Sequence, residues 1–180
     1  MCGINGFSWE DKNLIKQMNK IISYRGPDDK GTYTDKHVSL GHNRLSIIDL
    51  SKAGKQPMTN EDGSIFIVFN GEIYNFKEIK QKLIKKGHKF NSNTDTEVII
   101  HAYEEFGEEC LKLFNGMFAF AIWDTNNKKL FLARDRLGIK PLYYYLDQKN
   151  EKLIFSSEIK GILQHEIKKK INIQSFHSFL

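Results

Sequence analysis

The sequence predicts an α+β fold in which antiparallel sheets carry helices on their outer faces. Three segments, 11–22, 76–86 and 95–106, repeat apolar residues at the spacing of an amphipathic helix. The other apolar segments are short and joined by turn sequences, which is typical of strands in hairpins. Because the helices come in separate blocks, antiparallel sheets are favoured over a parallel sheet with alternating helices.

Each predicted helix has one apolar face. These faces are formed by Leu14, Met18, Ile21 and Ile22 in 11–22, by Phe76, Ile79 and Leu83 in 76–86, and by Val98, Ala102 and Phe106 in 95–106. Asn75 and Glu78 have the spacing of a capping box, and Thr94 and Glu97 form a second one. A further short helix is expected at 107–114.

Strands are expected in the remaining apolar segments. In chain order they are Cys2–Phe7, Thr32–Thr34, Val38–Asp49, Ile65–Phe69, Met117–Asp124, Lys129–Asp135, Leu142–Leu146 and Leu153–Ser156. Asn126-Asn127 is a turn sequence and predicts a hairpin between the two strands beside it. The last two strands are expected to form another hairpin.

Length and composition limit the class of protein. A chain of 180 residues with 40% hydrophobic and 27% charged residues is expected to form one domain with its own core. No apolar run approaches the roughly 20 residues of a membrane span, and the N-terminus lacks the features of a signal peptide. With two cysteines and no CxxC or HExxH spacing, we expect a reduced, cytoplasmic protein without a metal site.

The positive charge does not by itself indicate a nucleic-acid partner. The formal net charge is +5 and the isoelectric point is about 9.0. The lysines, however, are spread along helical segments such as 77–86 without interleaved aromatic residues, which is typical of a solvated face. We therefore expect neither a nucleic acid nor a membrane as partner.

Cys2 is the first candidate for chemistry. If Met1 is removed, Cys2 carries a thiol and a free α-amine on one residue. The reference pKa of an α-amine, about 7.7–8.0, suits a general base at neutral pH, and a deprotonated thiol is a strong nucleophile. The simpler interpretation is a small residue that only permits removal of Met1.

Asn70-Gly71 follows the apolar strand 65–69 and allows two interpretations. Asn-Gly is the strongest short hairpin sequence, but the residues after it, 72–75, run quickly into a helix and leave little room for a partner strand. An Asn amide and a backbone N–H that project beyond a strand would suit an oxyanion hole.

Arg44 and Asp95 together suit the two charged ends of an α-amino acid. Arg44 lies in an apolar strand of a protein rich in lysine, and its planar guanidinium matches a carboxylate; the alternative is an ion pair with Asp49 or Glu72. Asp95 lies at a helix start, where it could receive an ammonium group or simply complement the helix dipole. The histidines form no spacing pattern, and we interpret them and the second cysteine, Cys110, as structural.

These segments together resemble the class II (N-terminal nucleophile) glutamine amidotransferase domain. The resemblance is closest to the N-terminal half of glutamine-hydrolysing asparagine synthetase and runs from Cys2 to about Leu163. Its segments, in order, are Cys2-Gly3-Ile4, Arg25–Asp28, Asn43–Leu50, Asn70–Asn75, Thr94–Glu97, Gly116–Asp124, Arg134–Tyr143 and Ser156–Lys160. No single segment is specific for this family, but eight of them in the same order are.

The resemblance implies a four-layer αββα sandwich of two antiparallel sheets, as in N-terminal nucleophile hydrolases, and a role for each candidate residue. Cys2 would attack the side-chain amide of glutamine, with its α-amine as base, and form a γ-glutamyl thioester. The oxyanion would be held by Asn70 and by the N–H of Gly71. The glutamine backbone would be bound by Arg44 at the carboxylate, by Asp95 and Glu72 at the amine, and along the backbone of Leu45 and Ile47.

The same resemblance implies a part that this sequence does not contain. Asparagine synthetases carry an ATP-binding loop of the Ser-Gly-Gly-x-Asp-Ser kind, which is absent here. We therefore expect residues 1–165 to form the glutaminase domain and 166–180 to begin a linker or helix towards a synthetase domain or subunit. In asparagine biosynthesis, ATP and Mg²⁺ would act only in that synthetase domain or subunit. This chain would need no cofactor.

Two alternatives remain open from the sequence. The chain could be a catalytically silent module that senses glutamine or binds a partner, if Met1 stays in place. It could also supply ammonia to an acceptor other than aspartate. The segments 134–143 and 156–160 are candidates for shaping a domain interface, although purely structural roles fit them equally well.

Overall fold

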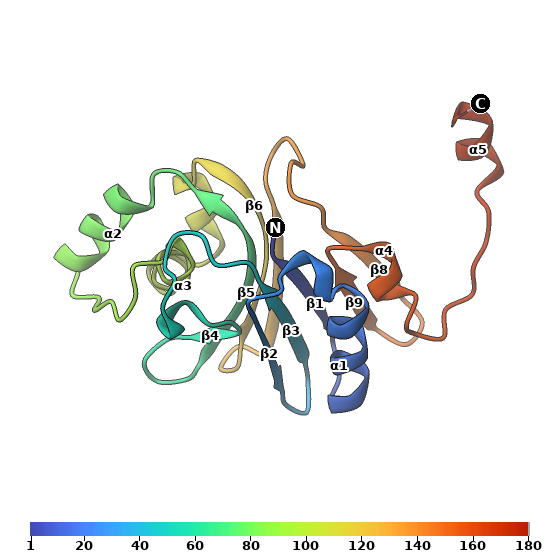
Figure 1. Ribbon diagram of the computed structural model, residues 1–180, viewed down its shortest axis with the longest axis horizontal. Coiled ribbons are helices and arrows are strands. Elements are labelled where there is room, and N and C mark those ends of the chain that lie inside the picture. The colour runs from blue at the N-terminus through green and yellow to red at the C-terminus, as the bar shows by residue number, and fades with distance from the viewer. Residues whose placement is uncertain (180) are drawn as a thin grey trace.

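Two antiparallel sheets form the centre of the molecule (Figure 1). The structure, a computed structural model, describes residues 1–179. One sheet has the strand order β2-β3-β1-β9-β8 and the other has the order β4-β5-β6-β7. The strands are β1 (Gly3–Phe7), β2 (Asp29–Thr34), β3 (Ser39–Arg44), β4 (Met58–Thr59), β5 (Ile65–Ile73), β6 (Gly116–Asp124), β7 (Lys129–Arg134), β8 (Tyr143–Asp147) and β9 (Lys152–Ser156).

Helices cover the outer face of each sheet. The α-helices are α1 (Lys12–Ile21), α2 (Phe76–Lys85), α3 (Asp95–Phe106), α4 (Ile159–Ile162) and α5 (Ile173–Phe179), and 3-10 turns cover Ser23–Arg25, Lys52–Gly54 and Gly107–Leu113. α1 and α4 contact the five-stranded sheet, whereas α2 and α3 lie over the four-stranded sheet (Figure 1). α5 lies apart from this body, and within residues 1–179 no helix has the length and apolar character to cross a membrane.

Three apolar clusters fill the spaces between four layers. One cluster, which includes Ile4, Leu40 and Val68, lies between the two sheets. A second joins the four-stranded sheet to α2 and α3, and a third joins the five-stranded sheet to α1 and α4. The predicted four-layer αββα sandwich of two antiparallel sheets is therefore confirmed.

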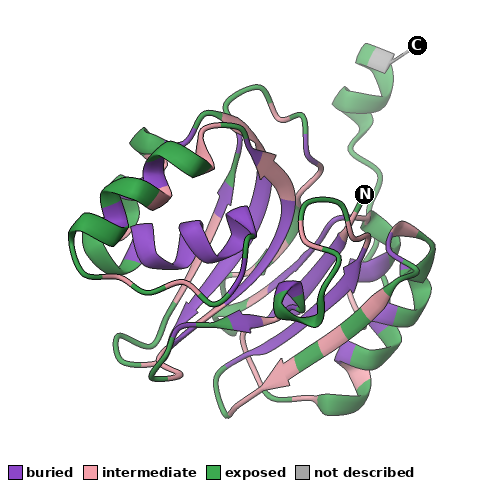
Figure 2. Ribbon diagram, turned by 60° about the vertical axis from the view of Figure 1, so that its left-hand side comes forward, coloured by how far each residue is buried: buried purple, intermediate pink, exposed green. Residues whose placement is uncertain are grey.

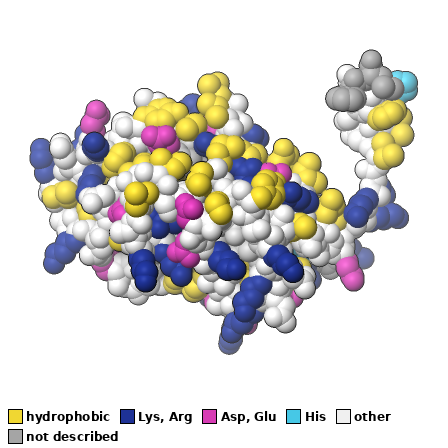
Figure 3. Space-filling model, viewed as in Figure 1, with side chains coloured by type: hydrophobic (Ala, Val, Ile, Leu, Met, Phe, Trp, Pro, Cys, Tyr) yellow, Lys and Arg dark blue, Asp and Glu magenta, His cyan; other side chains and the backbone are white. Residues whose placement is uncertain are grey.

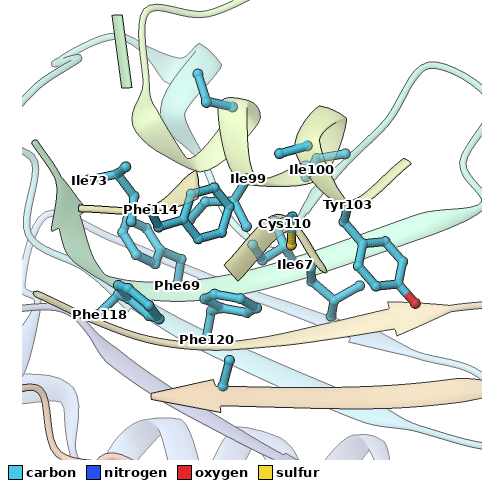
Figure 4. Close-up of a cluster of buried hydrophobic side chains, with 14 of the residues drawn as sticks. Ile67, Phe69, Ile73, Ile99, Ile100, Tyr103, Cys110, Phe114, Phe118 and Phe120 are labelled. Carbon is cyan, nitrogen blue, oxygen red and sulfur yellow. The ribbon is translucent and has the colours of Figure 1, made fainter. Parts of the chain in front are cut away.

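The alternation of side chains along β5 and β6 produces two of these clusters. Val68 faces the other sheet, while its neighbours Ile67 and Phe69 face the helices, because successive strand residues point to opposite faces. Figure 4 shows Phe69, Phe118 and Phe120 below the side chains of α3. α3 is itself almost wholly buried from Asp95 to Tyr103, as Figure 2 shows, so its N-terminus is held rigidly against the sheet.

Two predicted strand boundaries are wrong in a way that matters for the site. The strand expected over Val38–Asp49 ends at Arg44, because its neighbours stop there: Asn43 pairs with the start of β1 and Arg44 with the start of β2. The strand expected over Ile65–Phe69 continues to Ile73. Asn70-Gly71 is therefore neither a hairpin turn nor a projection beyond the strand, because β6 pairs with β5 along its whole length.

The helix starts were predicted with partial success. Thr94 caps α3 by accepting a hydrogen bond from Glu97 N–H, as expected, but the Glu97 carboxylate binds the N–H groups of 91 and 92 instead of returning to Thr94. Asn75 makes no cap bond to α2; its side chain contacts the backbone at 113 and 115. Ile21, expected on the buried face of α1, is 41% exposed.

Candidate active site

One pocket contains all the site residues that the sequence singles out. It lies between the N-terminus, the end of β3 with the loop after it, β5, and the start of α3, and its volume is about 90 Å³ with Met1 in place. The predicted site residues that line it are Cys2, Arg44, Leu45, Ile47, Asn70, Gly71, Glu72 and Asp95. Segments up to 93 residues apart in the chain therefore meet at one place.

The pocket is built on a free edge of β5. Beyond Ile67, β5 has a neighbouring strand only on the β6 side among the residues that the structure describes. On the open side the N–H of Phe69 donates to Gln56 Oε1 at 2.7 Å, and the N–H of Ile73 donates to Asp95 Oδ2 at 2.9 Å. Side chains from other segments thus replace the missing strand at these two positions.

Gly71 lies between Phe69 and Ile73 in β5, and its N–H points to the same open side of the strand as theirs. Its partner in the ladder, Phe118, directs both its N–H and its C=O to Asp135 on the far side, so the two residues exchange no hydrogen bond. Within residues 1–179, the Gly71 N–H has no bond to β6, and it faces the pocket. A Cβ at this position would lie 2.4 Å from the carbonyl oxygen of Met117, which explains the glycine.

Asn70 offers a second free donor beside Gly71. Its side chain is 1% exposed, and Nδ2 has no hydrogen-bond partner among the described residues. An unsatisfied buried amide is unusual, because it costs about 1–3 kcal/mol. Two unpaired donors on consecutive residues therefore face one small pocket.

Cys2 places its thiol against the first residue after β3. Its Sγ lies 3.4 Å from the N–H of Leu45, which donates to it, and 3.6 Å from the carbonyl oxygen of the same residue. Burial raises the pKa of the Cys2 thiol above its usual value, although the Leu45 N–H and the charge of Arg44 oppose this. The thiol therefore needs a base before it can act as a nucleophile.

Arg44 closes another side of the pocket. Its guanidinium is 7% exposed and donates to the carbonyl oxygens of Asp49 and Ser51, the latter at 2.8 Å. These bonds shape the 45–51 loop, and the alternative of an ion pair with Asp49 or Glu72 is not what the structure shows. Gly54 allows the close approach, since a Cβ there would lie 2.1 Å from Arg44 Nη2.

Asp95 is a buried carboxyl group at the start of α3. Burial raises its pKa to about 6, with a smaller contribution from the charge of Glu72, whereas the N–H of Ile73 opposes the shift. The carboxylate is thus the prevailing form at pH 7, but it lies in an unfavourable environment that an ammonium group would improve.

Ile47 lines the rim of the pocket, and its side chain is 69% exposed. Sequence reasoning missed Gln56 and Lys140, which also line it. Gln56 joins Phe69 N–H to Thr96 Oγ1, and the Lys140 ammonium lies 3.1 Å from the sulfur of Met1. Lys140 falls within a segment that the resemblance covers, but nothing in the local pattern places Gln56 here.

A larger hollow of about 980 Å³ lies elsewhere, between α1, β2 and the loop 55–59. Gln56 lines both cavities, but none of the predicted site residues lines the larger one. The Asn70 and Gly71 donors and the Cys2 thiol are all in the smaller pocket, which makes it the candidate active site.

The two packed antiparallel sheets, with helices on both outer faces, match the fold of N-terminal nucleophile hydrolases. One similar solved structure is glutamine phosphoribosylpyrophosphate amidotransferase from Bacillus subtilis, with a TM-score of 0.72. The match covers 89% of this chain and 43% of the amidotransferase chain. The sequence identity is 21%, so this similarity concerns the fold.

Sequence comparisons give the family. A family model described as a glutamine amidotransferase domain matches residues 1–180, and the chain belongs to this family. It is 46% identical over 96% of its length to a Methanocaldococcus jannaschii protein assigned as glutamine-hydrolysing asparagine synthetase 2. It is 43% identical over 99% of its length to glutamine-hydrolysing asparagine synthetase 1 of Bacillus subtilis. The chain spans 37% and 30% of the lengths of these two relatives.

Proposed function

We propose that this chain hydrolyses glutamine to glutamate and ammonia at Cys2 and passes the ammonia to a synthetase domain or subunit. The observation that carries the proposal is a pair of donors in the pocket that holds the Cys2 thiol: Asn70 Nδ2, which has no partner among the described residues, and the Gly71 N–H, which the register turns away from β6. Donors of this kind are aimed at a charge that develops only during the reaction.

The chemistry begins when Met1 is removed and the α-amine of Cys2 becomes free. The amine takes the thiol proton, and Sγ attacks the side-chain carbonyl carbon of glutamine. The oxyanion that forms is held by Asn70 and Gly71; one such donor contributes about 2.7–4 kcal/mol in comparable sites. As the oxyanion collapses, the C–N bond breaks and the amine returns the proton to the departing ammonia. Water then cleaves the γ-glutamyl thioester to release glutamate and the thiol.

The charged groups of the pocket fix the substrate. Arg44 keeps guanidinium N–H groups beyond its two carbonyl partners and would bind the α-carboxylate. Asp95, assisted by Glu72, would bind the α-ammonium group. The backbone of Leu45 and Ile47 would line the remaining side. None of these steps uses a metal ion or a cofactor.

The acceptor of the ammonia lies outside this chain. Both relatives are named as asparagine synthetases and are much longer than this chain, so we propose a synthetase partner that makes asparagine and uses ATP and Mg²⁺. The exposed apolar side chains of Leu137, Ile139 and Tyr144 offer it a contact surface. Figure 3 shows that hydrophobic side chains gather along the upper part of the molecule in that view. We place the glutaminase unit at 1–165 and a linker at 166–180, whose described residues beyond 167 are exposed. The free thiols of Cys2 and Cys110 fit a reducing, cytoplasmic compartment.

The test is glutamate release from glutamine by protein whose N-terminus begins at Cys2, as established by intact-mass spectrometry. Activity should be lost in Cys2→Ala and fall by about 100- to 1,000-fold in Asn70→Ala. Protein that retains Met1 should be inactive, because its Cys2 nitrogen is an amide. If processed protein releases no glutamate, alone or with a synthetase partner, the chain is instead a silent module.

A further inference from the structure

A group of side chains with metal-binding chemistry lies on α3, away from the pocket. His101 and Glu104 are three residues apart on α3 and therefore share a face, and His88 reaches them from the loop after α2. Each offers one ligand atom, and these atoms all lie within 4.8 Å of one another. Glu104 Oε2 lies 2.6 Å from His101 Nδ1 and 3.7 Å from His88 Nδ1.

These separations are close to those of a zinc site. Ligands bound at about 2.0–2.1 Å in a tetrahedron lie about 3.3 Å apart. The shorter contact, between His101 and Glu104, would have to open, and the longer one, between His88 and Glu104, would have to close. The ligand nitrogens of His88 and His101, at most 4.8 Å apart, would also have to settle at this separation.

The surrounding groups hold the ligands in the orientation that metal binding needs. His88 Nε2 lies 3.3 Å from a carboxylate oxygen of Glu105, and Glu104 Oε1 accepts from the side-chain amide of Asn60 at 2.8 Å. In protein metal sites, a ligating histidine almost always donates its other ring N–H to an oxygen, and a ligating carboxylate is itself hydrogen-bonded. Two of the three ligands already have such a partner.

The third ligand, His101, carries an unexplained polar atom. Its side chain is 1% exposed, yet Nε2 has no hydrogen-bond partner among residues 1–179. The nearest acceptors are Glu97 Oε1 at 3.9 Å and Glu61 Oε1 at 4.0 Å. A metal ion on Nδ1 would fix the proton on Nε2, whose nearest acceptors are these two carboxylates.

The charge of the cluster also favours a cation. Lys86 pairs with Glu105 at 2.5 Å, and among the described residues no other lysine or arginine forms an ion pair with the carboxylates around the two imidazoles. The four carboxylates around the two imidazoles are Glu61, Glu97, Glu104 and Glu105. With neutral imidazoles this leaves an excess of negative charge, which a divalent ion would offset.

We propose that His88, His101 and Glu104 form a binding site for a divalent transition-metal ion with zinc-like preferences. Two imidazoles and one carboxylate supply three ligands, and the fourth position is open to water. The side chains of His88 and Glu104 are 18% and 23% exposed, so an ion can enter from solvent. The ion would join the end of α2 to the middle of α3, about 9 Å along the helix from Asp95. The sequence gives no warning of this site, because one ligand comes from a different segment at no recognisable spacing.

The test is calorimetric titration of ZnCl₂ into the chelator-treated full chain carrying Cys2→Ala, which removes a competing thiol. We expect one Zn²⁺ per chain and a rise in Tm with zinc concentration. His88→Ala should lower the affinity at least 100-fold. Glu105→Gln, which weakens the partner of His88 and removes the ion pair with Lys86 but leaves all three ligands, should lower it about tenfold. His37→Ala, an exposed histidine elsewhere, is the matched control and should change nothing.

Cobalt provides a second measurement that does not depend on folding stability. Co²⁺ bound to the parent chain should give the intense visible absorption of tetrahedral coordination, and His88→Ala should lack it. Equal zinc affinity in His88→Ala and His37→Ala would overturn the proposal, as would the absence of stoichiometric binding. Either result would leave a hydrogen-bonded cluster that holds the two helices together. Neither depends on glutaminase activity.

Discussion

Replacing Asp95 by Asn should stabilise the protein while weakening its binding of glutamine. The Asp95 carboxyl is 4% exposed, and burial raises its pKa from 3.8 to about 6. The folded state therefore binds the proton more tightly than the unfolded state does. The buried Asp95 carboxylate therefore lowers the free energy of unfolding by its full amount above about pH 6 and has no effect below about pH 3.8. A shift of about two units corresponds to about 3 kcal/mol, which Asp95→Asn should recover at pH 7.5.

Urea unfolding at several pH values measures this difference. The gain in the free energy of unfolding should be about 3 kcal/mol at pH 7.5 and roughly half of that at pH 5. Asp62→Asn is the control, because hydrogen bonds from Ser64 lower the pKa of Asp62 and its stability trend with pH has the opposite sign. If Asp95→Asn is no more stable at pH 7.5, or if its advantage does not narrow as the pH falls, the reasoning is refuted.

The same substitution tests the proposed contact with the substrate amine. An Asn amide cannot replace a charge-assisted hydrogen bond, which contributes about 1.5–3 kcal/mol. KM for glutamine should therefore rise about ten- to hundredfold in Asp95→Asn, with a smaller change in kcat. In the unsubstituted protein KM should rise as the pH falls below about 6, where Asp95 becomes protonated. A KM that is independent of both changes would remove Asp95 from the substrate site.

Three further predictions concern binding and stability. Arg44→Lys should chiefly raise KM for glutamine, because a lysine cannot make the bidentate contact; an unchanged KM in steady-state assays would exclude Arg44 from carboxylate binding. Phe120→Ala should cost about 3–5 kcal/mol in urea unfolding, since its side chain is fully buried. Phe131 is only partly buried, so Phe131→Ala should lower the free energy of unfolding by less; equal losses for the two variants would contradict this expectation. Thr94→Ala should cost about 1 kcal/mol through loss of the α3 cap, and the loss should disappear in Thr94→Ser.

Local patterns predicted the elements well and their ends less well. The periods of the helices and the hairpin at Asn126-Asn127 depend on neighbours in the chain, so the sequence contains them directly. The end of β3 at Arg44 depends on where β1 and β2 begin. The passage of β5 through Asn70-Gly71 depends on β6, which supplies a pairing partner as far as Gly116 and overrides the turn preference.

The site shows the same division. Cys2, Arg44, Asn70 and Asp95 could be named because their residue types are chemically unusual for their positions. The free direction of the Gly71 N–H was implied by the resemblance alone, because it follows from the register between β5 and β6 and from the bond between Asp135 and Phe118, which local residue types do not reveal. The neighbours Gln56 and Lys140 enter from loops whose positions depend on the whole fold.

The proposed reaction passes through a γ-glutamyl thioester on Cys2, and hydroxylamine can trap this intermediate. With glutamine and hydroxylamine, protein that begins at Cys2 should form γ-glutamyl hydroxamate, because hydroxylamine intercepts the thioester in place of water. Cys2→Ala should form none. Hydroxamate formation by Cys2→Ala at the same rate, or glutamate release by the processed protein without any hydroxamate, would exclude the thioester on Cys2.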